Sequence, residues 1–170
     1  MLRTILTALF LLPGSMAWSN SCSLSFVIEI TQGVGTIRPG AMLSGSANFT
    51  TAESYRQEGG STAYIATGNM SLGTTITGPI WTIITTRRTF AADLVALYAR
   101  DVTGFDFAGV AFDGPMALTL YGYPGTRLTE APPQTQIEWD SLTLRRSFQL
   151  HASGRDMLAG DIMELTANCI

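Results

Sequence analysis

The chain of 170 residues contains no lysine, a single histidine and only two cysteines. Its ten positive charges are therefore all arginines, and the only adjacent pairs are Arg87–Arg88 and Arg145–Arg146. A formal net charge of -3 without a basic cluster gives no electrostatic surface for a phosphate backbone, so we expect no nucleic-acid partner. Because the chain also lacks a G-x-S-x-G segment, the lone His151 does not complete the pattern of a serine hydrolase.

Long apolar runs are also absent. The longest near the start, Ile5 to Leu12, follows Arg3 and precedes small residues at Ser15 and Ala17. This layout predicts a signal peptide over residues 1–17, because the run is well short of the ~20 residues that cross a bilayer. We therefore expect a single domain over residues 18–170 with no transmembrane segment. The protein is expected to be exported, to the periplasm or beyond the cell.

Alternation of apolar and polar residues dominates the rest of the sequence. In the segment SLSFVIEIT, Leu24, Phe26 and Ile28 share one face of a strand. Eight or nine such segments, separated by Gly- and Pro-containing turns, predict an all-β fold. We expect an antiparallel two-sheet β-sandwich of jelly-roll type, with a barrel as the alternative. Residues 90–101 fit either a short helix or an irregular strand, and Gly45 indicates a bulge or a close backbone approach.

The order of these segments resembles a family of exported bacterial β-sandwich domains, of the type associated with PEP-CTERM sorting tails. The segment GAMLSGSANF supplies Gly40, Gly45 and Phe49, and the segments RRSFQL and GDIMEL match its later strands. The resemblance implies a β-sandwich fold and export. It implies no catalytic residue, since the family has no general catalytic signature.

The two cysteines, Cys22 and Cys169, stand near the two ends of the expected mature chain. Exported proteins usually pair their cysteines, so we predict a disulfide between them. Two free thiols or an intermolecular bond are the alternatives. A disulfide requires the two Cα atoms to lie within about 7 Å, so the first and last strands should be neighbours.

Acidic residues provide two further hypotheses. Glu138 and Asp140 in the segment EWDSLT would share a strand face, as in β-sandwich glycoside hydrolases, which use two carboxylates about 5 Å apart. The third acid of that pattern is replaced by Thr143, so a solvated strand edge is the better interpretation. Asp101, Asp106 and Asp113 share one loop-rich region, where turn formation is favoured over a calcium site because no known calcium-loop spacing is present.

Four aromatic residues, Trp81, Trp139, Tyr121 and Tyr123, offer flat rings for sugar binding or for the core. We therefore expect a non-enzymatic exported module, for binding or structure, with no catalytic residue, metal ligand or cofactor assigned. A glycan or a protein is the expected kind of ligand. The alternative is a glycan-binding or glycan-hydrolysing protein that uses Glu138 and Asp140.

Overall fold

The computed structural model describes the chain from residue 20 onward with short gaps, so the expected signal peptide lies outside the described residues. The described ranges are 20–56, 61–76, 81–86, 92–102, 105–107, 109–127, 129–152 and 156–170. Their elements are β1 (Asn20–Gln32), β2 (Met42–Arg56), β3 (Ser61–Leu72), β4 (Thr74–Ile76), β5 (Trp81–Thr86), β6 (Asp93–Ala99), β7 (Phe105–Phe107), β8 (Val110–Gly122), α1 (Gln136–Asp140), β9 (Arg145–Ala152) and β10 (Met157–Cys169).

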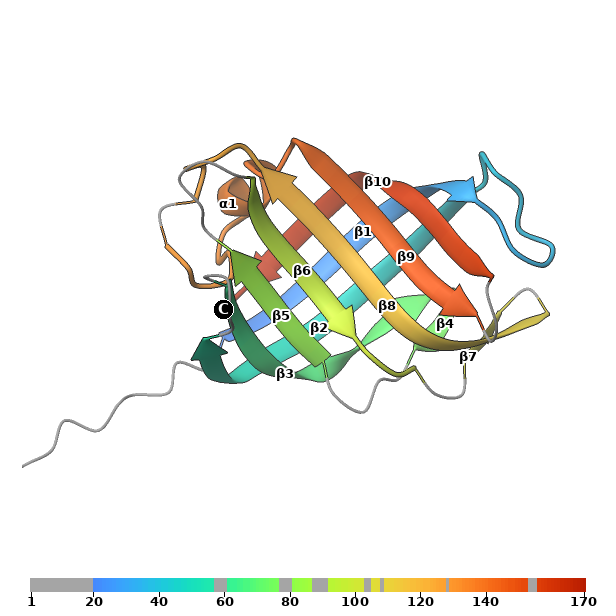
Figure 1. Ribbon diagram of the computed structural model, residues 1–170, viewed down its shortest axis with the longest axis horizontal. Helices are drawn as coiled ribbons and strands as arrows, with labels where there is room; N and C mark the ends of the chain where they lie inside the picture. The colour runs from blue at the N-terminus through green and yellow to red at the C-terminus, as the bar shows by residue number, and fades with distance from the viewer. Residues whose placement is uncertain are drawn as a thin grey trace, which may run out of the picture.

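These strands form an antiparallel barrel (Figure 1). Eight of them close in the order β1, β2, β3, β5, β6, β8, β9, β10, because β10 pairs with β1 and β2 pairs with β3. The short strands β4 and β7 extend the sheet beside β3 and β8. The all-β prediction is confirmed, whereas the two-sheet sandwich is wrong. The sandwich needs unpaired edges between its sheets, and the described pairings leave none in this ring of eight strands.

Inward-facing side chains fill the barrel. Along β1, β8 and β9, buried apolar residues alternate with more exposed ones for most of the strand, as a half-buried strand requires. The largest fully buried side chains are Trp139, Phe148, Leu24, Ile28, Ile30, Met70, Leu72, Ile83, Met116, Leu118 and Leu120. The interior is thus a packed core, as expected for a barrel of this strand number.

The structure decides between the two interpretations of segment 90–101 and places the short helix elsewhere. Residues 93–99 form strand β6, so the strand interpretation of segment 90–101 is correct for its described part. The short helix lies instead at Gln136–Asp140, in the connection between β8 and β9. Strand β9 begins only at Arg145, so Leu142 is buried before the strand while Leu144 is 46% exposed.

The disulfide between Cys22 and Cys169 is present, and the two Cα atoms lie 4.1 Å apart. The first and last strands are neighbours, as predicted, and the two cysteines are register partners. Backbone hydrogen bonds between Ser21 and Ile170 continue the pairing to the end of the chain. The covalent bond therefore lies at the seam where the two ends of the domain meet.

Gly45 allows an aromatic ring to lie across the backbone of β2. A Cβ atom at this position would stand 2.3 Å from Cε2 of Phe26, which is the cross-strand partner, and 2.8 Å from the carbonyl oxygen of Ser71. The pairing of β1 with β2 continues through Gly45 without a bulge. The backbone approach predicted from the sequence is confirmed at the carbonyl oxygen of Ser71, and the Phe26 ring, which the sequence did not predict, lies closer still.

We expect Gly45→Ala to destabilise the domain by roughly 1–3 kcal/mol, because the buried Phe26 ring must leave its rotamer or shift the backbone. Urea denaturation monitored by circular dichroism measures the loss. Gly40→Ala is not a suitable control, because the φ angle of Gly40 is positive and alanine would be strained there. Ser44→Ala, at an exposed position of β2, should change stability by less than about 0.5 kcal/mol. Equal midpoints for Gly45→Ala and wild type would contradict the packing role.

Candidate functional site

The outer surface of β3, β2, β1 and β10 carries an uncharged polar patch, here called the amide–hydroxyl face. Its side chains point outward because their neighbours in sequence, such as Cys22, Leu24 and Phe49, point into the core. The patch consists of Ser21, Ser23, Asn48, Thr50, Thr67, Asn69 and Asn168.

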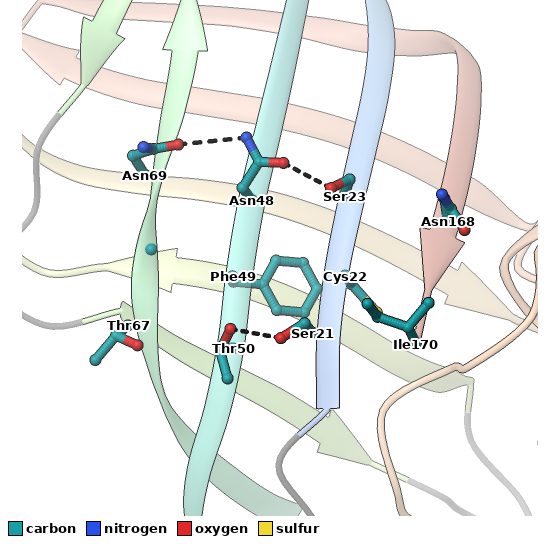
Figure 2. Close-up of a pocket in the computed structure, with 11 residues that line it drawn as sticks. Ser21, Cys22, Ser23, Asn48, Phe49, Thr50, Thr67, Asn69, Asn168 and Ile170 are labelled. Carbon is teal, nitrogen blue, oxygen red and sulfur yellow. Dashed lines mark hydrogen bonds between the residues drawn. The ribbon is translucent and has the colours of Figure 1, made fainter.

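Cross-strand register arranges these side chains in rows. Asn69, Asn48, Ser23 and Asn168 are successive partners across the four strands. Figure 2 shows the first three in one line, with Ser23 Oγ donating to Asn48 Oδ1 at 2.7 Å. The Asn48 amide nitrogen in turn donates to Asn69 Oδ1 at 3.5 Å. The central side chains of the row are therefore oriented by one another.

A second row of side chains lies two residues away along each strand, on the same face of the sheet. Thr67, Thr50 and Ser21 are partners across β3, β2 and β1, and the hydroxyls of Ser21 and Thr50 lie 2.8 Å apart. Thr67 makes no side-chain hydrogen bond to another described residue. The two rows together present hydroxyl and amide groups, which both donate and accept hydrogen bonds.

The face is hollowed between the two rows. The depression has a volume of about 400 Å³, and none of the side chains lining it is charged. Gly68 also lines the depression, and a Cβ atom there would stand only 2.0 Å from the carbonyl oxygen of Asn48. The missing side chain at Gly68 therefore lets the backbones of β2 and β3 approach.

A second polar cluster lies at the capped end, the end of the barrel covered by α1 and the described residues of segment 123–135 (Figure 1). Three inward-facing side chains reach Glu130 there. Thr62 donates to its carboxylate at 3.0 Å, and Tyr64 and Thr85 donate to its carbonyl oxygen. These bonds fix the connecting segment across the barrel.

Arg127 and Asp93 complete the capped end. Asp93 is fully buried, and one of its carboxylate oxygens accepts from the backbone N–H of Arg127 at 2.8 Å. The guanidinium of Arg127, itself 7% exposed, donates to the carbonyl oxygens of Leu94 and Ala131. A cation and an anion are thus buried together, and hydrogen bonds hold the loop to β6.

Burial determines the direction of both pKa shifts found at this end. It lowers the pKa of Arg127 below its ordinary value, an effect that the carboxylate of Asp93 opposes. It raises the pKa of Tyr64, which the charge of Arg127 opposes. Tyr64 therefore remains a neutral hydrogen-bond donor, as its contact with Glu130 requires.

Glu138 and Asp140 lie on α1, so their placement on a strand face is wrong. Glu138 closes a capping box with Thr135, accepting from the backbone N–H groups of Gln134 and Thr135. Asp140 accepts from Gln136 and lies 3.8 Å from Arg146. Both carboxylates therefore serve the local structure of the helix. The segment TQIE carries the capping-box pattern that would have predicted this helix.

The aromatic platform considered from the sequence does not form as a set. Trp139 is only 1% exposed and packs into the core from α1, and its indole N–H has no hydrogen-bond partner among the described residues. Tyr123 is 61% exposed, and the side chain of Trp81 lies outside the described residues. The hypothesis that these rings jointly line a sugar-binding surface is therefore wrong for Trp139.

The acidic loop shows no ion site in its described part. Asp101 and Asp113 are exposed, and the side chain of Asp106 lies outside the described residues. Across the described ranges, no group of three His, Cys, Asp or Glu residues is placed to hold a metal ion. In the same ranges no helix is both long and apolar enough to cross a membrane.

Sequence reasoning missed the amide–hydroxyl face, although part of its signal was visible. Thr67 and Asn69 fall on the outward positions of the segment AYIATGNMSLG, and Asn48 and Thr50 alternate in the same way. The signal was a run of outward Ser, Thr and Asn without charge in three strands. Comparison with protein-family models, curated proteins and solved structures finds no match to this chain.

Proposed function

We propose that this protein is an exported, non-enzymatic binding module whose amide–hydroxyl face binds uncharged, polyhydroxylated ligands, in practice glycans. The single observation that carries the proposal is the ordered and uncharged polar lining of the 400 Å³ depression. A charged ligand would find no counter-charge among these residues. A strongly apolar ligand would leave their amides and hydroxyls without partners, at a cost of about 1–3 kcal/mol for each group.

The hydrogen-bonding capacity of the face supports this ligand class. Asn69 accepts from Asn48 but donates to no described residue, and the side chains of Thr67 and Asn168 have no hydrogen-bond partner among the described residues. Sugar hydroxyls both donate and accept, so they match such amides and hydroxyls. Polar groups already held by their neighbours lose little freedom when a ligand binds, which favours affinity.

Export is supported by two features that do not depend on the ligand. Residues 1–17 have the layout of a cleavable signal peptide, and Cys22 and Cys169 form a disulfide. Disulfides persist mainly in oxidising compartments such as the periplasm and the extracellular space. A non-enzymatic role is supported by Glu138 and Asp140, because the contacts of both carboxylates belong to α1 and its flanking residues.

The proposal predicts weak but specific binding of a neutral oligosaccharide. With no exposed aromatic ring lining the depression, we expect a Kd on the order of 1 mM, about 4 kcal/mol of binding free energy. Isothermal titration calorimetry and ¹H–¹⁵N NMR, with hexamers of cellulose, xylan and amylose, measure it. Shifted amide resonances should map to β1, β2, β3 and β10.

The variant Asn69→Val/Asn168→Val tests the face directly, since valine keeps a strand-forming side chain at both positions. Loss of two hydrogen bonds should reduce affinity roughly 5- to 150-fold. Thr119→Val/Ser147→Val is the matched control, because these two residues are outward cross-strand partners on β8 and β9. Equal affinity in the two double variants, or no binding of any neutral oligosaccharide by the wild type, would refute the proposal.

A further inference from the structure

We infer that the amide–hydroxyl face takes an extended, unbranched glycan chain that lies across β3, β2, β1 and β10, and that a single sugar is not its ligand. This inference rests on the proposed function and specifies its ligand. Three observations carry it: the length of the rows, the place of their unpaired groups, and the residues that line the two sides of the depression.

The first observation is the length of the polar row. Asn69, Asn48, Ser23 and Asn168 are register partners on four adjacent strands. Neighbouring strands lie about 4.8 Å apart, so the row spans about 14 Å across the sheet. A single pyranose ring does not bridge this distance, whereas a short chain of sugars does.

The second observation is that the unpaired groups lie at the two ends of the row. Ser23 and Asn48 are joined at 2.7 Å, and the amide nitrogen of Asn48 is directed to Asn69. The Asn69 amide nitrogen at one end and the Asn168 side chain at the other donate to no described residue. A ligand that satisfies both ends must therefore extend over the paired centre.

The third observation is the composition of the second row, which runs parallel to the first. Thr67, Thr50 and Ser21 contribute hydroxyls, and Ile170 pairs with the backbone of Ser21 beyond them. The side chain of Ile170 is 90% exposed. It offers an apolar contact for the C–H face of a sugar ring at the β10 end of the depression.

Residues two apart on a strand are separated by about 6.8 Å, so the two rows form the sides of a channel that crosses the strands. Both rows line the same depression, as Figure 2 shows for their labelled members. No side chain of the lining is charged, so a neutral polymer fits it and a uronic-acid polymer does not gain an ion pair. An extended neutral glycan therefore matches the length, direction and charge of the channel.

A chain-length series tests the inference. Glucose and its β-1,4-linked oligomers of two to six sugars are titrated into the disulfide-bonded domain. Binding is measured by ¹H–¹⁵N NMR and calorimetry. The α-1,4-linked glucose series and the xylose series are titrated in parallel. In the series that binds, the Kd is expected to fall at least tenfold from one sugar to four and then to level off, because the rows have a finite length.

End-row variants give the second readout. Asn69→Val and Asn168→Val, made singly, should each flatten the dependence on chain length, while Thr119→Val on β8 leaves it unchanged. If a single sugar binds as tightly as the tetramer, the inference is refuted and the proposed function remains. If no oligomer binds, both are refuted. An affinity that keeps rising from four to six sugars in the wild type would also refute the inference, since it requires a longer site than these rows.

Discussion

Replacing both Cys22 and Cys169 with alanine is expected to lower the free energy of unfolding by up to about 5 kcal/mol, the value given by the chain-entropy model for a loop of this length. The bond joins residues separated by 147 positions and so restricts almost the whole unfolded domain. This expected loss is comparable with the total stability of many single domains. The double variant should therefore unfold at a much lower urea concentration.

The place of the disulfide in the barrel adds to this effect. Every other pairing in the closed ring joins strands that are close in sequence, such as β1 with β2 or β9 with β10. The pairing of β1 with β10 joins the two ends of the domain. Bringing these two strands together closes the longest loop of the ring and therefore costs the most conformational entropy. The covalent bond thus stabilises the β1–β10 pairing, whose two strands are the farthest apart in the sequence.

Urea denaturation of three samples separates the covalent contribution from the loss of side-chain packing. These samples are the oxidised wild type, the wild type reduced with dithiothreitol, and the double alanine variant. Reduction alone should account for most of the lowered midpoint, although Cys22 is only 3% exposed and its truncation adds a small packing loss. Coincident midpoints for the oxidised and reduced wild type would contradict the stabilising role of this bond.

The strands were predictable from the sequence, but their closure into a barrel was not. Leu24, Phe26 and Ile28 alternate with outward residues, and this alternation is the same whether the strand lines a barrel or one layer of a sandwich. What distinguishes the two folds is that the strand pairings form a closed ring, in which β10 pairs back onto β1. Such pairing depends on long-range register, and local alternation does not encode it.

The amide–hydroxyl face could likewise be predicted only in part from the sequence. The outward direction of Thr67 and Asn69 follows from the alternation of β3, so each polar position was visible in the sequence. Their assembly with Ser23 and Asn168 requires the register of three strand pairs, and one of them, β1 with β10, joins segments at the two ends of the domain. The disulfide was predictable because the expected export and a count of two cysteines left few alternatives, and its geometry then required β1 and β10 to be neighbours.

Replacing Arg127 is expected to cause the second large loss of stability. Arg127→Met keeps most of the buried stem but removes the guanidinium that faces the fully buried Asp93. Removing one partner of a buried ion pair typically costs about 3–5 kcal/mol, because the other charge remains in a medium of low dielectric. The substitution also removes the hydrogen bonds from the guanidinium to the carbonyl oxygens of Leu94 and Ala131, which hold the described part of segment 123–135 to the barrel. Chemical denaturation should show this decrease.

Two further variants identify the cause of that decrease. Arg145→Met removes an exposed arginine at the start of β9 and should change stability by less than about 0.5 kcal/mol. Arg127→Met/Asp93→Asn replaces the buried carboxylate with a neutral amide that still accepts from the backbone N–H of residue 127. This double variant should therefore be more stable than Arg127→Met alone, because a neutral amide replaces the buried carboxylate that has lost its neighbouring guanidinium. If it is less stable, the carboxylate of Asp93 contributes mainly through contacts other than Arg127, and the buried charge is not the cause.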